Sequence, residues 1–175
     1  MGRDKALLPF GSVPVAAHIA AQVEQIASAV FFVGSPELYG HLGYPVLPDL
    51  HPGYGPVGAI ATALASTKTA WNFVLACDMP CIRADVLREL ADAAVKHGAC
   101  CAYPVSTDGR EHPLCGVYHA STRSIFEAAV TEGEHRLLRV VARLNPYVLE
   151  VNDPEQFRNV NTPEEWEAIA ARTDR

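Results

Sequence analysis

The feature that most constrains this chain is an alternation between short, continuous apolar runs and longer segments with helical spacing. Residues 72–76 read Asn-Phe-Val-Leu-Ala, whereas residues 85–95 place Val86, Leu87 and Leu90 on one side of a helix. A strand that is apolar on both faces is typical of a sheet covered by helices on both sides. The alternation therefore predicts a three-layer α/β domain with a mainly parallel mixed sheet.

The other elements follow the same pattern. We expect strands at residues 29–33, 45–47, 72–76, 99–104, 114–118 and 147–151. We expect helices at residues 15–26, 59–65, 85–95, 122–130 and 137–144. A last helix opens at Thr162, with Glu165 placed to complete a capping box. The sequence shows no internal repeat, low-complexity tract or linker, which predicts one domain over residues 1–175.

Composition and charge limit the partners of such a domain. With 175 residues, 49% hydrophobic, the chain can bury one sizeable core and is too apolar for a disordered protein. It carries 14 Lys and Arg against 20 Asp and Glu, a net charge of −6, and has no basic run. Binding to a phosphate backbone needs a positive patch, so we exclude nucleic acid as a partner.

No membrane-spanning segment is expected, because no apolar stretch approaches the roughly 20 residues that such a helix needs. The first residues are charged and lack the long apolar segment of a secretory signal, which favours the cytoplasm. The five cysteines are odd in number and irregular in spacing, so we expect reduced thiols that act as small buried hydrophobes. Zinc is a weak alternative, because Cys77 and Cys81 have no second pair of matching spacing.

Polar residues follow three of the predicted strands, where α/β sheets place their ligands. The first strand ends at Gly34-Ser35, the second at Asp49 and the third at Asp78. A carboxylate in such a place suits Mg²⁺, which screens phosphate oxygens, and Asp78 is the strongest candidate. The alternative for Asp78 is an Asx-turn or helix cap before Pro80.

Three weaker signals lie elsewhere in the chain. The glycines of residues 53–58 precede a helix and would let backbone amides approach an anion, although an ordinary turn explains them equally well. Lys5 could neutralise a phosphate or could be a solvated surface residue. His112 could be a base or ligand, but more often such a residue caps a turn.

Five segments in order resemble the molybdenum cofactor guanylyltransferase family, and the resemblance covers essentially the whole chain. The segments are MGRDKALL at 1–8, GPVGAI at 55–60, ACDMP at 76–80, GREHPL at 109–114 and NVNTPE at 159–164. The resemblance implies a Rossmann-like nucleotidyltransferase domain that uses Mg²⁺, GTP and molybdopterin. It also implies transient contact with proteins that insert or receive the cofactor.

The resemblance assigns roles to individual residues. Lys5 and Asp78 would be catalytic, with Lys5 on phosphate and Asp78 on the metal. The nucleotide would be bound by Lys5, Ser35, Asp49, Gly55 and Asp78. The pterin side would be formed by Arg110, His112 and Asn161. A terminal phosphate of molybdopterin would attack the α-phosphorus of GTP, and because that phosphate is already anionic, catalysis would need positioning and charge neutralisation rather than a strong base.

One departure from the family concerns the start of the chain. Family members carry a buried strand and a Gly-rich loop, Leu-Ala-Gly-Gly, before the counterpart of Met1-Gly2, and we expect the natural protein to carry this element too. The alternatives are a related transferase, acting on molybdopterin with CTP or on a sugar or lactyl phosphate, and a non-catalytic nucleotide-binding module. Turnover separates an enzyme from a module, and base choice separates the transferases.

Overall fold

The predicted alternation of strands and helices is present in the computed structural model, which describes residues 4–158, 160 and 169. Its strands are β1 (Pro9–Phe10), β2 (Val13–Pro14), β3 (Phe32–Val33), β4 (Val46–Leu47), β5 (Trp71–Leu75), β6 (Cys101–Ser106), β7 (Cys115–His119) and β8 (Tyr147–Val151). Its α-helices are α1 (Val15–Glu24), α2 (Pro36–Tyr39), α3 (Gly55–Ser66), α4 (Ala84–Lys96), α5 (Arg123–Thr131) and α6 (Leu137–Ala142). The 3₁₀ turns are η1 (Lys5–Leu7), η2 (Gly40–Leu42), η3 (Ala120–Thr122) and η4 (Pro154–Phe157).

The strands form a mixed sheet, as predicted. One sheet has the order β5-β7-β6-β8, in which β7 is antiparallel to β5 and β6, and β8 is parallel to β6. Three of these four strands therefore run in the same direction, and β7 alone is reversed. A separate parallel pair, β3-β4, lies on the β5 side, and β1-β2 is a small hairpin.

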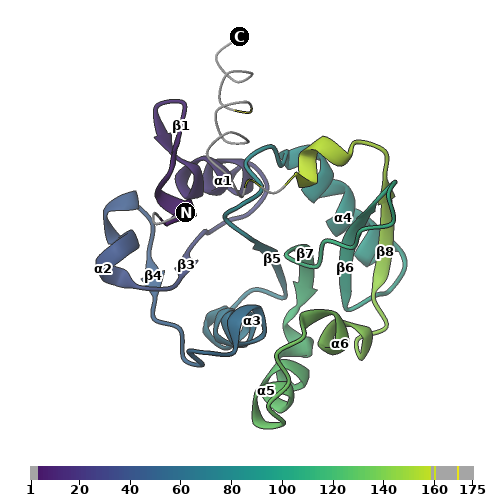
Figure 1. Cartoon of the computed structure of the whole chain (residues 1–175). Helices are drawn as coiled ribbons and strands as arrows, with labels where there is room; N and C mark the ends of the chain where they lie inside the picture. The colour runs from purple at the N-terminus through teal and green to yellow at the C-terminus, as the bar shows by residue number, and fades with distance from the viewer. Residues whose placement is uncertain (1–3, 159, 161–168, 170–175) are drawn as a thin grey trace.

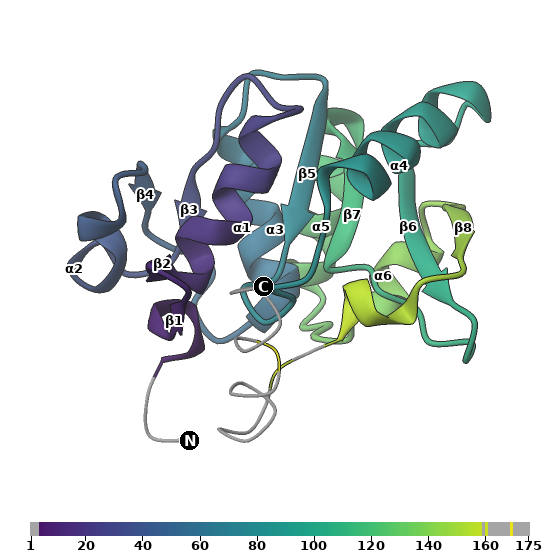
Figure 2. The ribbon, with the colours of Figure 1, turned by 90° about the horizontal axis from the view of Figure 1, so that it is seen from above.

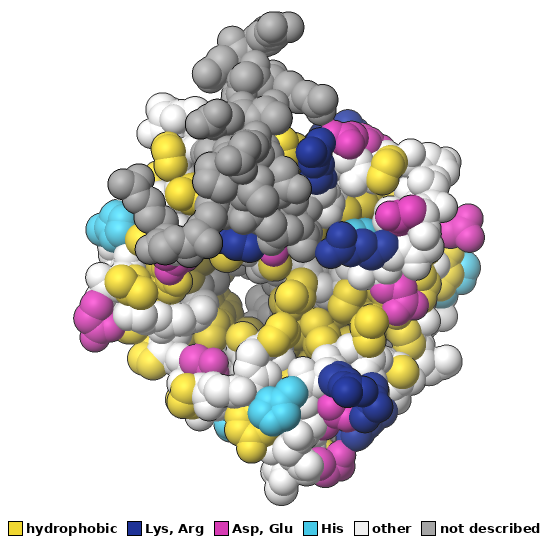
Figure 3. Space-filling model, viewed as in Figure 1, with side chains coloured by type: hydrophobic (Ala, Val, Ile, Leu, Met, Phe, Trp, Pro, Cys, Tyr) yellow, Lys and Arg dark blue, Asp and Glu magenta, His cyan; other side chains and the backbone are white. Residues whose placement is uncertain are grey.

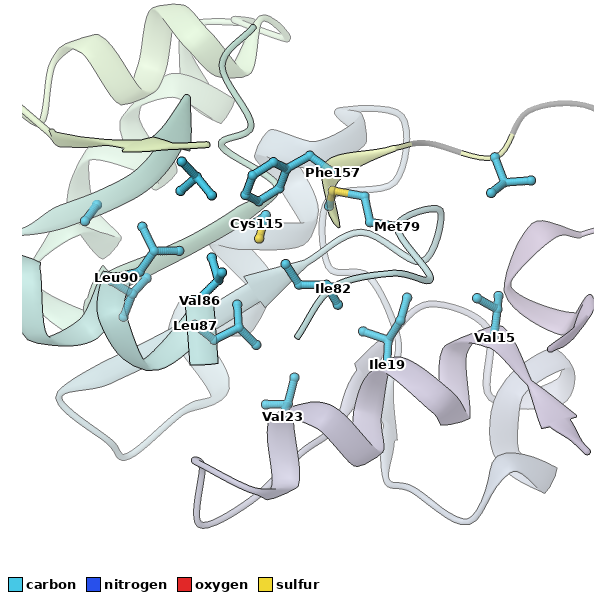
Figure 4. Packing of buried hydrophobic residues seen from close by; sticks show 14 of the residues in the cluster. Val15, Ile19, Val23, Met79, Ile82, Val86, Leu87, Leu90, Cys115 and Phe157 are labelled. Atoms are coloured by element: carbon cyan, nitrogen blue, oxygen red, sulfur yellow. The ribbon is translucent and has the colours of Figure 1, made fainter. Parts of the chain in front are cut away.

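Helices cover both faces of the row of strands (Figure 1). Helices α1 and α4 lie on one face, and α3, α5 and α6 lie on the other; Figure 2 shows the same arrangement from above. On the first face, Ile19 of α1 and Leu87 of α4 belong to one buried cluster with Ile82 between the helices (Figure 4). Phe157 closes the same cluster against Met79 and Cys115. This face matches the apolar spacing that predicted α1 and α4.

A second core fills the opposite face. Tyr118 of β7 and Phe126 of α5 are fully buried, with ring centroids 5.7 Å apart in an edge-to-face arrangement. The Tyr118 hydroxyl donates a 2.7 Å hydrogen bond to the Pro113 carbonyl, so the buried phenol is not left unsatisfied. Val57 and Ile60 of α3 join this cluster.

The predicted strand at residues 29–33 is the least well placed. Only Phe32 and Val33 pair with β4, and β3 has no strand on its other side among the described residues. The strand is shorter than predicted because residues 29–31 have no paired strand beside them among the described residues. Without backbone pairing, an apolar segment does not form a strand. The sequence analysis also missed α2 and the β1-β2 hairpin, and the helix expected from Thr162 falls outside the described residues.

The cysteines differ in burial, and Cys81 is partly buried. All five are free thiols; Cys101 and Cys115 are buried, as expected, but Cys77 and Cys100 are exposed, so the expectation of buried hydrophobes is wrong for these two. Both exposed cysteines lie outside the strands: Cys77 is two residues after β5, and Cys100 directly precedes β6. Among the described residues, no helix is long and apolar enough to cross a membrane.

Candidate active site

A cavity of about 1210 Å³ opens between the β3-β4 pair and β5, and it brings together three of the predicted site residues. Lys5, Gly55 and Asp78 all line it. Four others, Ser35, Asp49, Arg110 and His112, are not part of its lining, and Asn161 lies outside the described residues.

Lys5 is the first residue of η1. The Asp4 side chain caps this turn by accepting a 3.0 Å hydrogen bond from the Ala6 N–H. Lys5 also acts electrostatically on the thiol of Cys77, the residue before Asp78. The turn therefore holds the lysine beside the carboxyl end of β5, although the two segments are far apart in sequence.

Asp78 stands three residues after the end of β5. Its carbonyl accepts a 3.0 Å hydrogen bond from the Val160 N–H, which fixes the backbone at this point. The pKa of the neighbouring Cys77 thiol is raised, first by desolvation and next by the carboxylates of Asp78 and Asp4. Asp78, Asp4 and Lys5 therefore all lie within electrostatic reach of the Cys77 thiol, and Asp78 and Lys5 line the cavity.

Tyr39 is a part of this site that sequence reasoning missed. Its hydroxyl donates a 2.5 Å hydrogen bond to Asp4 Oδ2, and its ring lies against Gly34, where an added Cβ would come within 2.7 Å of the ring. Asp4 therefore holds η1 with one oxygen and Tyr39 with the other. Burial raises the pKa of Tyr39, and the hydrogen bond to Asp4 raises it further. The contact between Tyr39 and Asp4 joins residues that are 35 positions apart, so no local sequence pattern reveals it. The one sequence signal at this contact is that Asp4 precedes Lys5.

The amino end of α3 is open toward the cavity. Gly55, its first residue, has a φ of +53°, which favours glycine, and the preceding Tyr54 makes no side-chain cap. An added Cβ at Gly58 would come within 2.6 Å of the His51 carbonyl oxygen, so the preceding loop folds tightly onto the helix. Uncapped N–H groups and the helix dipole favour an anion at this point.

Asp49 holds that loop rather than facing the cavity. Its Oδ1 accepts hydrogen bonds from the His51 N–H at 2.9 Å and from the buried Thr62 hydroxyl at 3.0 Å. The Thr62 oxygen in turn accepts from the Leu50 N–H at 3.0 Å. The structure thus gives Asp49 a positioning role for the loop before α3, and nucleotide binding by this residue stays a prediction.

Ser35 has a local role at the carboxyl end of β3. Its hydroxyl oxygen accepts a 3.4 Å hydrogen bond from the Leu38 N–H as the cap of α2, and it donates to Glu37 at 2.6 Å. Contact of Ser35 with a guanine base stays a prediction.

Arg110 and His112 lie on the β6-β7 connection. Arg110 is exposed, whereas His112 is 7% exposed and stacks on Phe157 with ring centroids 4.7 Å apart. His112 Nε2 lies 3.0 Å from the Ser106 hydroxyl, which itself donates to Asp108 at 2.6 Å. Desolvation lowers the pKa of His112, and the nearby Arg110 lowers it further, which favours the neutral imidazole. His112 is thus a buried support for the loop that presents Arg110.

The donor set at the mouth of the cavity fits a magnesium ion. Among the described residues, no three His, Cys, Asp or Glu side chains converge as a complete metal cage. Mg²⁺ usually takes one or two carboxylates and completes its shell with water and substrate phosphates. Asp78, with Asp4 nearby, matches that requirement, whereas a structural zinc site would need four close ligands.

A lysine, a carboxylate and an open helix terminus at the carboxyl edge of a three-layer α/β sheet define a nucleotidyltransferase of the Rossmann-like class. Comparison with known proteins agrees. The family model described as "MobA-like NTP transferase domain" matches residues 1–147, and the chain belongs to that family.

The matches to relatives and to solved structures cover most of the chain. A molybdenum cofactor guanylyltransferase from Shewanella loihica is 31% identical over 97% of this chain and 88% of its own length. A probable molybdenum cofactor guanylyltransferase from a Nostoc species is 33% identical over 99% of this chain and 86% of its own. The structure of molybdopterin-guanine dinucleotide biosynthesis protein A from Archaeoglobus fulgidus has a TM-score of 0.82 at 22% identity, covering 99% of this chain and 92% of its own.

Proposed function

We propose that this protein transfers GMP from GTP to molybdopterin, forming the guanine dinucleotide cofactor and releasing pyrophosphate. The observation that carries the proposal is the meeting of Lys5, Gly55 and Asp78 at one cavity, in a chain whose relatives bear the name molybdenum cofactor guanylyltransferase. These residues come from three separate segments, and each suits a phosphate or its counterion.

The chemistry requires charge to be neutralised in a protein that is itself anionic, with a net charge of −6. Lys5 supplies a cation beside the mouth, and the amino end of α3 supplies N–H groups. Mg²⁺ held by Asp78 would screen the phosphate oxygens from one another when bound. Lys5, the amino end of α3 and the metal would thus offset the repulsion between the anionic substrates and the net negative charge of the protein.

In the proposed reaction, an oxygen of the terminal phosphate of molybdopterin forms a bond to the α-phosphorus of GTP. The bond from that phosphorus to the bridging oxygen of the β-phosphate breaks, and pyrophosphate leaves with the electron pair. No proton has to be removed from the attacking oxygen, because it is already ionised. The protein residues therefore act by binding and orienting the two anions, which is the largest contribution available in phosphoryl chemistry.

The pterin side of the proposed site is the β6-β7 connection. Ser106, Asp108 and the buried His112 hold this loop in one conformation. Arg110 is then presented to solvent, where its guanidinium can pair with an anionic group of molybdopterin. Arg110 would bind, and His112 would position the loop.

Pyrophosphate release in the presence of GTP, Mg²⁺ and molybdopterin tests the proposal directly. We expect Lys5→Met to reduce turnover at least tenfold, whereas Lys96→Met, at the exposed end of α4, should leave it unchanged. Turnover with CTP in place of GTP would point to the cytidylyl alternative. Stabilisation by GTP without turnover would point to a nucleotide-binding module.

A further inference from the structure

Two loops of the proposed site lie side by side at the carboxyl end of β5. One loop follows β5 and carries Asp78, and the other is the β6-β7 connection, which presents Arg110. Their bases are joined, because the Ala76 N–H donates a 2.8 Å hydrogen bond to the Leu114 carbonyl. Ala76 and Leu114 both line the cavity, and Figure 3 shows the surface hollowed near its centre, with hydrophobic side chains around the opening. The metal side and the pterin side of the proposed site thus share one base.

A third segment passes from the β6-β7 connection to the Asp78 loop. It starts at Val151, the last residue of β8, which pairs with Ser106 at the end of β6. It reaches Val160, whose N–H donates a 3.0 Å hydrogen bond to the Asp78 carbonyl. We call residues 151–158 and 160 the crossing segment. Backbone contacts therefore hold one of its ends beside the β6-β7 connection and the other against the Asp78 loop.

Phe157 lies in the crossing segment and packs against both loops. Its ring stacks on His112, with ring centroids 4.7 Å apart and an interplanar angle of 21°. Phe157 also shares a buried cluster with Met79, the residue after Asp78, and Figure 4 shows the two side chains next to each other. One ring thus packs against the residue that supports the Arg110 loop and against the neighbour of the candidate metal ligand.

Burial, more than charge, holds the Phe157 ring in this place. Phe157 is 2% exposed, and the preceding Gln156 is also buried, with its Nε2 donating a 3.2 Å hydrogen bond to Asp153 Oδ2. Arg83, at the end of the Asp78 loop, lies 4.0 Å from the same Asp153 oxygen, but this ion pair is exposed and contributes little. The orientation of the ring therefore depends on its packing and its stack.

Movement passes through such a contact, because a close-packed interior leaves little room for one side chain to shift alone. His112 is fixed on its other side by the Ser106 hydroxyl, 3.0 Å from Nε2, so the imidazole moves with the β6-β7 connection. A displacement of His112 displaces the Phe157 ring, and the ring displaces Met79. The two loops are thus linked through one aromatic side chain.

We propose that Phe157 is a positioning residue that couples the two loops, so that a ligand that orders one loop also orders the other. Phe157 acts on Arg110 through His112 and on Asp78 through Met79. The identity of the two ligands rests on the proposed function, whereas the coupling of the loops does not. For the proposed reaction, GTP with Mg²⁺ and molybdopterin favour each other's binding, and such coupling is reciprocal.

Amide hydrogen exchange in the ligand-free protein tests the coupling without reference to any reaction. Ser106→Ala removes the hydroxyl beside His112 Nε2 and so loosens the β6-β7 connection. We expect this change to speed exchange of the Val160 amide about threefold or more when Phe157 is present, and to add nothing in the Phe157→Leu background. Phe157→Met keeps the buried volume without the flat ring and should give the same result as Phe157→Leu.

Ser121→Ala is the matched control for the exchange experiment. Ser121 Oγ lies 2.8 Å from His119 Nδ1, a serine–histidine pair at the opposite end of β7 from the two loops. This change should leave exchange of the Val160 amide as it is in both backgrounds. Equal acceleration by Ser106→Ala with and without Phe157, or no acceleration in either background, would overturn the proposal.

Ligand binding tests the consequence for the proposed reaction. The probes are molybdopterin and a GTP analogue with a methylene group between the α- and β-phosphorus atoms, which cannot release pyrophosphate. We expect the analogue with Mg²⁺ to tighten molybdopterin binding about fivefold or more in the unsubstituted protein and less than about twofold in Phe157→Leu. Phe126→Leu, the same change in the second core, should keep the full coupling.

No tightening in the unsubstituted protein, or equal tightening in Phe157→Leu and Phe126→Leu, would overturn the proposal. The proposed function fails in a different way, because it requires GMP transfer by the unsubstituted protein. Absence of transfer together with the expected difference in exchange of the Val160 amide would refute that function and support the coupling of the loops.

Discussion

Two regions of this molecule are built from strands and helices, yet they differ in packing. We call the region around β7 the closed half and the region around β3 and β5, where the cavity lies, the open half. In the closed half, four of the five residues of β7 are buried, whereas none of the five residues of β5 is buried, although helices cover both faces. The difference is in the neighbouring strands: within the described part of the chain, β7 lies between two strands and β5 pairs with one. Helical cover alone therefore does not bury a strand. The open half also carries Lys5, Gly55 and Asp78, so stability and the proposed chemistry are concentrated in different halves.

Matched substitutions in the two halves should show the largest contrast. Phe126→Ala in the closed half should lower the free energy of unfolding by about 3–5 kcal/mol, because it empties a fully buried site. Phe73→Ala on β5 should cost about 1–2 kcal/mol, since that residue is already partly exposed. Urea unfolding monitored by circular dichroism measures both. An equal cost would mean that β5 is as well packed as the closed half.

Asp78→Asn should separate activity from stability in the open half. We expect GMP transfer to fall by about 10²–10³-fold, because the charge that we propose binds Mg²⁺ is lost while the side-chain shape is kept. The urea midpoint should change little. Glu89→Gln, an exposed change on α4, serves as the control for both measurements. Retained Mg²⁺-dependent transfer in Asp78→Asn would remove Asp78 from the metal site.

Gly58→Ala tests the fit between α3 and the loop before it. The new Cβ would approach the His51 carbonyl oxygen to 2.6 Å, a backbone atom that cannot move alone. We expect a loss of about 1–3 kcal/mol in the free energy of unfolding, together with a higher KM for GTP as the amino end of α3 shifts. Gly40→Ala, where an added Cβ meets nothing within 4 Å, is the matched control.

Tyr39→Phe tests whether Asp4 positions Lys5 through its two hydrogen bonds. Loss of the 2.5 Å bond should raise the KM for GTP about two- to tenfold and lower kcat less, because the lysine remains but is less well held. Tyr44→Phe removes a 3.0 Å phenol–carboxylate bond to Glu24, away from η1, and should leave KM unchanged. Equal kinetics in the two variants would mean that Asp4 holds η1 without Tyr39.

The smallest expected effect is a dependence of stability on pH, with one histidine in each half. Desolvation lowers the pKa of His112; Arg110 lowers this pKa further, and Asp108 raises it. Desolvation also lowers the pKa of His18, and a hydrogen bond to the Pro80 backbone opposes that shift. A depressed histidine pKa means that the unfolded chain binds more protons. Stability is therefore full above the ordinary value of 6.5 and is lost as pH falls below it.

His112→Gln and His18→Gln should each flatten part of that dependence. Urea midpoints measured across this pH range separate the two contributions. If neither variant changes the slope, the loss of stability in acid comes from carboxylates rather than from these imidazoles.

Much of this fold follows from local pattern. The strand at residues 147–151 and the helix around 85–95 lie where apolar spacing placed them, because β8 pairs with β6 over its whole length and α4 buries one face along its length. The strand predicted at 29–33 forms only at Phe32 and Val33, since pairing, not spacing, decides where a strand ends. Asp78 was marked by its place after a predicted strand, and Lys5 was marked by the family resemblance of residues 1–8; both line the cavity, and their roles stay predictions. Asp49 was marked in the same way, but the structure turns its carboxylate toward its own loop.

By itself, the sequence determined the order of most elements and the α/β class, because these depend on side-chain type and on spacing along one segment. Only the tertiary structure decided that Lys5 and Asp78 line one cavity, that Tyr39 binds Asp4, and that this cavity lies between β3 and β5. Such contacts join segments far apart in the chain. They depend on how helices and strands pack in three dimensions, which no local pattern contains.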